Sequence, residues 1–263
     1  MKLNRDNFLV QVKYGDLLSD AGGINKYFLG FGGELYLEAE EIANYQTYII
    51  NRIKTLTMPK RLSLRIHAPI IEVDYSKIQS ALRRAQPVYE SLLGLCKTLG
   101  IKSIVTHADF DYRCAFPLEE QLKNAVILWS RLSGMLGKEN IRLNIENHFE
   151  PEPDYLLRLM DAVKSSNFAM CVDAGHLNAF GTLSMRDWLK KYPAGSIREI
   201  HLADNLGDGD THLPMGKGNI DFENFFKILS ERNENYVFIL EPRNIEEAKE
   251  SLIFLEKKGY LVK

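Results

Sequence analysis

The sequence predicts a single α/β domain over residues 1–263, built as a closed barrel of eight parallel strands that alternate with helices. Eight short apolar runs rich in β-branched residues alternate with longer segments of helical period, which is typical of parallel sheets. The length suits one (β/α)8 or TIM barrel of about 250 residues, and no linker or low-complexity stretch divides the chain. A doubly wound open sheet is the competing architecture, but no Gly-x-Gly-x-x-Gly turn follows an early strand.

The expected elements follow in order along the chain. Strands are expected at 8–14, 33–39, 61–68, 102–108, 141–148, 168–175, 197–204 and 236–242. Helical patterns include 75–99, 118–136, 154–164, 222–231 and 246–258, with Asp154 and Asp221 as N-caps. The first unit is the weakest, since residues 15–30 predict only a short, irregular helix. Trp129 and Trp188 lie in helical patterns and are expected to pack in the core.

Composition and charge exclude several classes of protein. The chain is 45% hydrophobic and 26% charged, with a net charge of −2, so it has no general attraction to nucleic acid or anionic membranes. No apolar segment approaches the roughly 20 residues that span a bilayer, and the N-terminal stretch lacks the pattern of a signal peptide. Cys96, Cys114 and Cys171 have no metal-type spacing, so we expect a reducing, cytoplasmic setting. The oligomeric state, including a homo-oligomer, stays open.

All six histidines fall at or just after expected strand ends. Active sites of (β/α)8 enzymes lie at the carboxyl ends of the strands, whereas structural histidines would be scattered. These residues therefore predict one functional rim, made of His67, His107, His148, His176, His201 and His212.

Three carboxylates share this rim, because Glu146, Asp173 and Glu241 each end an apolar strand. A buried carboxylate costs several kcal/mol unless it is paired or bound to a metal. No matching cluster of lysine and arginine accompanies them. The pattern predicts a divalent-metal site; a hydrogen-bonded rim without metal is the alternative.

Strand parity places a second polar layer beneath the rim, since side chains two residues apart share a face. This layer is expected to contain Arg65, Asn144, Cys171, Glu199 and Ile239. Arg65 and Glu199 are then suited to form a buried ion pair beneath the metal. Cys171 is expected to be a small buried thiol.

Six motifs, "IHAPI", "VTHAD", "NIENH", "CVDAGH", "IHLADN…DTHLPMGKG" and "ILEP", occur in order between about residues 60 and 245. Together they resemble the xylose-isomerase-like TIM-barrel superfamily, which contains sugar isomerases, sugar-phosphate and ketose epimerases, and the endonuclease IV type of nuclease. The resemblance implies a four-ligand metal site made of Glu146, Asp173, His201 and Glu241. It also implies that both glutamates act as acid/base groups, and that His176 contacts a substrate hydroxyl.

The nuclease branch uses additional positions, and this sequence has them. The resemblance implies that the further ligands of a three-zinc cluster are His67, His107, His176, Asp210 and His212. One to three divalent ions are therefore expected. Imidazole-rich shells favour zinc, whereas the Glu/Asp-rich quartet also suits manganese, cobalt or magnesium.

Electrostatics favours sugar chemistry in carbohydrate metabolism over nucleic acid as the partner. Strong duplex binders make about six to ten phosphate contacts, and the strand-end loops show few basic residues: Arg113, Lys217 and Arg243. We therefore expect a metal-dependent isomerase or epimerase of a small sugar, sugar phosphate or polyol. The alternative is an endonuclease IV-like zinc phosphoesterase acting on abasic DNA; a non-catalytic binding barrel is a third interpretation.

The loops add smaller expectations. Lys217 and Arg243 are candidates to hold a phosphate or carboxylate of the substrate, with rim ion pairs as the alternative. "MGKG" at 215–218 is either a turn or a phosphate contact, and Asp204 and Asp208 are expected to hold the loop or face solvent. An aromatic wall for a sugar ring would come from Phe110, Tyr112 and Phe116.

Overall fold

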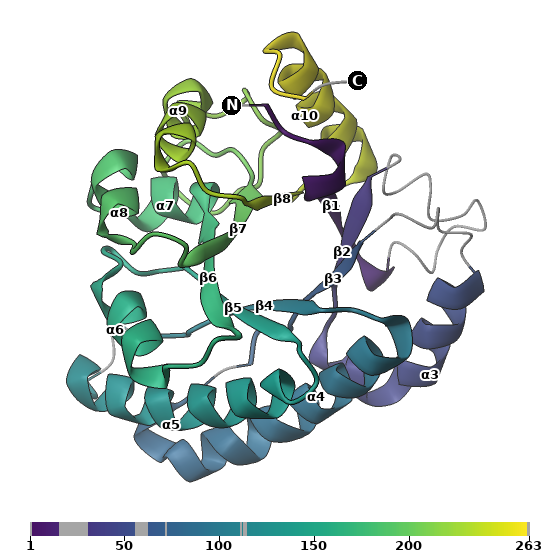
Figure 1. Cartoon of the computed structure of the whole chain (residues 1–263), viewed down its shortest axis with the longest axis vertical. Helices are drawn as coiled ribbons and strands as arrows, with labels where there is room; N and C mark the ends of the chain where they lie inside the picture. Colours follow the sequence, from purple (N-terminus) through teal and green to yellow (C-terminus); the bar gives the residue numbers. More distant parts are fainter. Residues whose placement is uncertain are drawn as a thin grey trace.

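The computed structural model describes residues 2–15, 31–55, 63–71, 73–110, 112 and 115–261. Its eight strands form a closed parallel barrel in sequence order, which confirms the predicted fold class (Figure 1). The strands are β1 (Phe8–Lys13), β2 (Gly32–Tyr36), β3 (Leu64–His67), β4 (Ser103–His107), β5 (Arg142–Glu146), β6 (Phe168–Asp173), β7 (Ile197–Leu202) and β8 (Val237–Leu240).

Helices surround this barrel. They are α3 (Ala39–Thr55), α4 (Ile78–Leu99), α5 (Leu118–Gly137), α6 (Asp154–Val163), α7 (Ala174–Phe180), α8 (Met185–Lys191), α9 (Phe222–Arg232) and α10 (Ile245–Lys257), with 3-10 turns η1 (Arg5–Asn7) and η2 (Tyr75–Lys77). Helices α3 and α7 were not among the patterns identified in the sequence, whereas α8 contains the helical pattern expected around Trp188. The expected irregular helix in residues 15–30 falls almost entirely outside the described residues.

Two local expectations need correction. Asp154 is the first residue of α6 rather than its N-cap, because Pro153 occupies the cap position. Strand β5 ends at Glu146, so His148 lies in the following loop instead of closing the strand. The other predicted cap is confirmed: the Asp221 carboxylate accepts a hydrogen bond of 3.0 Å from the Asn224 backbone N–H.

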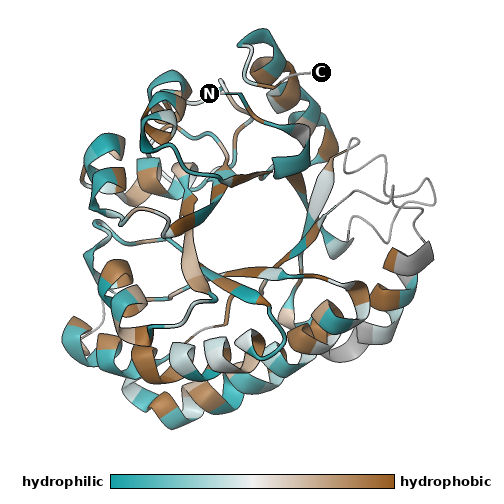
Figure 2. Ribbon diagram, in the orientation of Figure 1, coloured by the Kyte–Doolittle hydropathy of each residue, from teal (hydrophilic) through white to brown (hydrophobic). Residues whose placement is uncertain are grey.

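The hydrophobic core lies between the barrel and its helices. Helix α5 buries Leu128, Trp129 and Leu132, which fall on one face at helical spacing, and the helices carry hydrophilic residues toward the outside (Figure 2). Trp188 of α8 is also buried, so both tryptophans are packing residues as expected. Among the described residues, no helix is long and apolar enough to cross a membrane.

A polar layer crosses the barrel interior below the strand ends. Arg65 on β3 forms an ion pair with Glu199 on β7. The Ser103 hydroxyl donates to Glu199 at 2.7 Å, and the Asn144 side-chain amide donates to Ser103 at 2.8 Å. Glu199 is fully buried and Arg65 is 15% exposed, so the predicted ion pair beneath the rim is confirmed.

We expect Arg65→Met to lower the free energy of unfolding by about 3 kcal/mol, because it leaves the Glu199 carboxylate buried without its cation. Arg186→Met is the matched control, since it breaks the partly exposed Arg186–Glu231 pair of 2.7 Å and should cost less than about 1 kcal/mol. Urea unfolding of both variants measures the difference. Equal losses would contradict the role given to the buried pair.

Candidate metal centre

Glu146 lies at the centre of the rim, surrounded by four imidazoles. Its Oε2 atom is 3.2 Å from His67 Nε2 and 3.6 Å from His107 Nε2. Its Oε1 atom is 3.3 Å from His176 Nδ1 and 3.4 Å from His201 Nδ1. Burial by itself raises the pKa of Glu146, but His201 and His107 outweigh it and hold the pKa well below its usual value. The carboxylate is therefore ionised and offers both oxygens to neighbours.

A tight group of donor atoms forms around this carboxylate. Donor atoms of His67, Glu146, His201 and Glu241 all lie within 4.8 Å of one another. His201 Nδ1 is 2.9 Å from Glu241 Oε1, so an imidazole and two carboxylates converge on one point. Strand register explains the convergence, because His107 pairs with Glu146 across β4 and β5, and similar pairings continue around the barrel.

Asp173, the remaining member of the expected quartet, borders this group. Its Oδ1 atom accepts a 2.5 Å hydrogen bond from the His176 backbone N–H and so caps α7. Its Oδ2 atom is buried without a hydrogen-bond partner. Burial raises the pKa of Asp173 to about 7, and the nearby Glu241 adds to this effect. The structure thus brings Asp173 to the rim, with one oxygen already used as a helix cap.

Two further donor groups adjoin the first. One joins His107, Glu146 and His176, and the other joins His176 to the loop after β7 through Asp210 and His212. Asp210 Oδ2 is 3.3 Å from His176 Nε2 and 3.1 Å from His212 Nε2. Every predicted ligand residue therefore reaches one continuous rim, and Glu146 and His176 are each shared between groups.

Backbone carbonyls orient three of the imidazoles. The Nδ1 atoms of His67, His176 and His212 lie 2.8, 2.8 and 3.1 Å from the carbonyl oxygens of Ala68, Asn147 and Glu241, respectively. An Nδ1–H donated to a carbonyl leaves Nε2 as the lone-pair atom. In each case Nε2 then faces a carboxylate, which is the usual arrangement of a metal-binding histidine.

The chemistry of this donor set fits divalent metal ions. His107 Nε2, Glu146 Oε1, Asp173 Oδ2 and both ring nitrogens of His201 are buried without a hydrogen-bond partner. Buried polar atoms are almost always satisfied, so unpartnered atoms that converge on a point require an explanation. Metal ligation by Glu146, Asp173, His201 and Glu241, with the additional histidines, would satisfy these atoms except the second ring nitrogen of His201.

Several supporting residues were missed by the sequence analysis. Asn147 ties β5 to β6, because its amide accepts from the Asp173 N–H at 2.8 Å and donates to the Asp173 carbonyl at 3.1 Å. Gln11 donates to Glu34 at 3.0 Å and also to Glu241. These residues occupy inward strand positions or follow a strand directly, but an isolated Asn, Gln or Glu in a strand carries no specific signal.

The loop after β7 is organised by Asp204, as expected. This buried carboxylate accepts hydrogen bonds from the backbone N–H groups of Gly216 at 2.8 Å and Gly218 at 2.9 Å. Gly216 has a φ of +83°, and a Cβ at Gly218 would lie 2.2 Å from the Asn205 carbonyl oxygen. "MGKG" is therefore a turn whose N–H groups are already used, and Asp208 is exposed.

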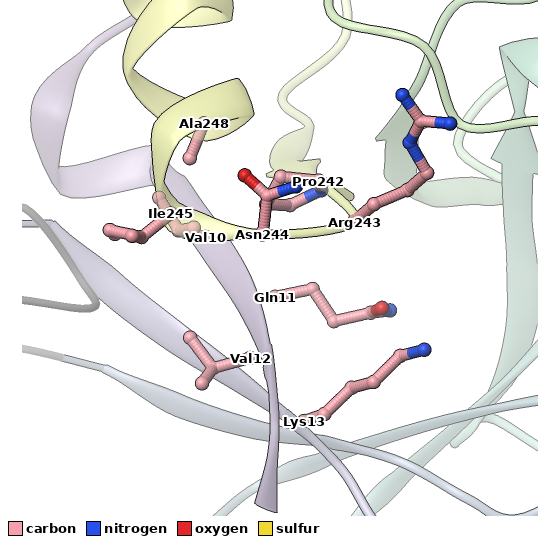
Figure 3. Close-up of a pocket in the computed structure, with 9 residues that line it drawn as sticks. All are labelled: Val10, Gln11, Val12, Lys13, Pro242, Arg243, Asn244, Ile245 and Ala248. Atoms are coloured by element: carbon pink, nitrogen blue, oxygen red, sulfur yellow. The ribbon is translucent and has the colours of Figure 1, made fainter. Parts of the chain in front are cut away.

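The expected substrate-binding cations are paired with acids. Arg243 binds Glu247 through two hydrogen bonds of 2.7 and 2.8 Å, and Lys217 is 3.9 Å from Glu250. A small cavity of about 140 Å³ lies between β1, the segment that follows β8 and the start of α10. Figure 3 shows Arg243 among the residues that line it. The side chains of Gln11, Lys13 and Arg243 extend away from its apolar side.

A larger cavity of about 590 Å³ adjoins the rim beside β4. Phe110, Phe116 and Phe149 line it together with Asp109, whose carboxylate belongs to a donor group with His107 and His148. This volume lies in the range of about 300–1,000 Å³ that is typical of small-molecule pockets. Tyr112, the third expected aromatic, packs on Tyr155 with ring centroids 6.2 Å apart.

Comparisons with known proteins agree with this architecture. The sequence profile of the xylose isomerase-like TIM barrel family matches residues 34–258. An uncharacterised protein of Methanocaldococcus jannaschii is 26% identical over 193 residues, covering 71% of this chain and 73% of the relative.

Two solved structures share the fold. A D-tagatose 3-epimerase-like protein has a TM-score of 0.74 at 19% identity, over 95% of this chain and 96% of that one. The TTHB071 protein of Thermus thermophilus, soaked with zinc chloride, has a TM-score of 0.71 at 21% identity, over 95% and 97% of the two chains.

Glu150 gives a pH-dependent prediction. Burial raises the pKa of this carboxyl group to about 7, above the value of about 4.3 in an unfolded chain. The folded state therefore binds the proton more tightly, and the stabilisation present below pH of about 4.3 is lost as pH rises through about 7. We expect the free energy of unfolding of the metal-free wild type, relative to Glu150→Gln, to fall by up to about 3 kcal/mol across this window.

Urea unfolding of both proteins between pH 4 and 8 measures this change, since all other titrating groups are common to the two chains. A difference that stays constant with pH would contradict it.

Proposed function

Since the chain belongs to the xylose isomerase-like TIM barrel family, we propose that it is a divalent-metal-dependent isomerase or epimerase of a small sugar, sugar phosphate or polyol. The observation that carries the proposal is the pair of buried glutamates beside one imidazole: Glu146 and Glu241 lie 3.4 and 2.9 Å from His201 Nδ1. The shared fold with a D-tagatose 3-epimerase-like protein supports the choice of substrate class.

The side chains that would hold the principal ion, zinc or manganese, are Glu146, Asp173, His201 and Glu241. Such an ion, when bound, would polarise the carbonyl and hydroxyl oxygens of a sugar. One glutamate then removes the proton from the carbon next to the carbonyl group, and the other returns a proton. His201 holds the pKa of Glu241 at about 2 against the effect of burial, so this carboxylate is ionised and can serve as a ligand.

His176 is proposed to contact the substrate. Its Nδ1 atom is 2.8 Å from the Asn147 carbonyl oxygen, which directs Nε2 toward the rim, where a substrate hydroxyl can be hydrogen-bonded. The cavity lined by Phe110, Phe116 and Phe149 offers an aromatic wall for the sugar ring. The free, buried thiols of Cys96 and Cys171 suit the reducing cytoplasm in which we place this activity.

A second candidate function is an endonuclease IV-like phosphoesterase with three zinc ions. Its specific support is the pair of additional donor groups, which share His176 and use His107 on one side and Asp210 with His212 on the other. The charge of the site also supports this candidate. Four carboxylates are buried there: Glu34, Glu146, Asp173 and Glu241. Arg65, the nearby cation, is paired with Glu199. One divalent ion leaves this cluster negative, and further ions balance it.

The sugar function stays first because, among the described residues, the two cations expected to hold a phosphate both face glutamates. These are Arg243 and Lys217; Arg113, the third basic residue of the strand-end loops, lies outside the described residues. The N–H groups of Gly216 and Gly218 already donate to Asp204. A small molecule is therefore the better-fitting substrate, since strong duplex binding depends on about six to ten phosphate contacts.

We expect Glu146→Gln and Glu241→Gln each to lower turnover by at least about 100-fold, because the amide removes the acid/base group. The measurement is NMR of ketose substrates in deuterium oxide, which reports epimer formation and exchange at the carbon next to the carbonyl. Metal content is measured in parallel, because both residues are also ligands. Glu150→Gln, a buried carboxylate outside the donor groups, should keep wild-type turnover; normal turnover in either ligand variant would exclude the proposed pair.

Metal analysis separates the two functions. A sugar epimerase using the quartet alone should contain about one ion per chain and leave an abasic duplex intact. A phosphoesterase should contain about three zinc ions, cleave that duplex, and lose about one ion in His212→Asn. Asp208→Asn, in the same loop but exposed, is the matched control and should retain every ion.

A further inference from the structure

Glu34 is a fully buried carboxylate of β2 that is not among the proposed metal ligands. It lies in register with Arg65 on β3, one layer below the rim. Its Oε2 atom is buried without a hydrogen-bond partner and lies 3.6 Å from His201 Nε2. His201 Nε2 is equally without a partner. Two complementary atoms thus face each other inside the barrel.

We propose that Glu34 is a positioning residue of the metal centre: it accepts a hydrogen bond from His201 Nε2–H and so directs the Nδ1 lone pair of this imidazole to the ion. The inference rests on the metal site of the proposed function. Closing the gap to a normal N–H···O distance of about 2.9 Å takes a movement of less than an ångström.

His201 needs such a partner because its backbone surroundings offer none. Metal-binding histidines donate their second N–H to a carbonyl or carboxylate, and His67, His176 and His212 each have a carbonyl at this position. His201 instead lies within β7, which pairs with β6 and β8 on both sides, so the carbonyls of these strands are used by the sheet. The carboxylate that faces its Nε2 is that of Glu34.

Metal binding also dictates which ring nitrogen carries the proton. His201 Nδ1 lies 2.9 Å from Glu241 Oε1 and faces the carboxylates of the rim. Ligation through Nδ1 requires its lone pair, so the proton of the neutral imidazole must be on Nε2. A buried Nε2–H without an acceptor is unfavourable, and Glu34 removes that penalty in the tautomer that binds metal.

Gln11 connects this positioning residue to a ligand. Its side-chain amide donates to Glu34 Oε1 at 3.0 Å and also to Glu241. One oxygen of Glu34 is therefore occupied, which leaves Oε2 directed at His201. The same amide fixes Glu241 beside the Nδ1 atom, so the ligand and the positioning carboxylate are set by one side chain.

The competing acceptor is Cys171, whose buried thiol also contacts His201. Sulfur is a weak acceptor compared with a carboxylate oxygen. Cys171→Ala therefore distinguishes the two, because it removes the sulfur and leaves Glu34 in place.

The test is the zinc Kd of metal-stripped protein, measured by competition with a chromogenic chelator. Glu34→Gln should weaken binding about 10- to 100-fold, the usual cost of removing such a partner. Glu150→Gln, an equally buried glutamate outside the donor groups, and Cys171→Ala should stay within about threefold of wild type. In the zinc-loaded protein, nitrogen-edited NMR should show an exchange-protected Nε2–H of His201 that shifts only in Glu34→Gln.

A wild-type Kd and an unchanged Nε2–H signal in folded Glu34→Gln would overturn the inference, as would a larger effect from Cys171→Ala. If Glu34→Gln does not fold, the same two measurements are made on Glu34→Asp. This variant keeps the charge but moves the carboxylate away from His201 by one methylene, so the same loss of zinc binding is expected. Failure of the wild type to bind zinc or manganese would instead overturn the proposed function, and this inference with it.

Discussion

The interior of this barrel depends on the compensation of one buried charge. Glu146 ends β5 with no solvent exposure, and an ionised carboxylate in that position is tolerable only if cations or hydrogen-bond donors surround it. Four imidazoles from different parts of the chain supply that environment. The same arrangement leaves several lone-pair atoms unpartnered, so the groups that compensate the buried charge also form a candidate metal site.

The groups around this charge are held in successive layers. Strand register places His107 beside Glu146, and Asp173 beside His201, at the same end of the barrel. Beneath them, the Arg65–Glu199 pair neutralises its own charges and contributes no net cation to the rim. Above them, Asp204 holds the loop that carries Asp210 and His212. Each layer restricts side chains whose charges would otherwise repel one another, or which would otherwise turn toward solvent.

One set of donors can serve two chemistries because function depends on how many ions it holds and on what surrounds it. The quartet with Glu146 and Glu241 suits proton transfer next to a polarised carbonyl group. The additional histidines suit a cluster that clamps a phosphate. The pairing of Arg243 with Glu247 removes one cation that a phosphate would need, and the aromatic cavity beside β4 offers a surface for a sugar ring instead.

The sequence alone determined the barrel, the histidines and carboxylates that gather at its rim, and the Arg65–Glu199 pair, because each depends on a periodicity or on a position at a strand end. It missed Glu34, Gln11 and Asn147, whose importance arises only from neighbours on other strands. Only the tertiary structure decided that one carboxylate oxygen of Asp173 caps α7, that "MGKG" is a turn, and that Arg243 faces Glu247. The physical reason is that the alternation of residues along a strand sets which face of the sheet a side chain occupies. Its hydrogen-bond partners and the compensation of its charge depend instead on which strands and loops become neighbours when the barrel closes.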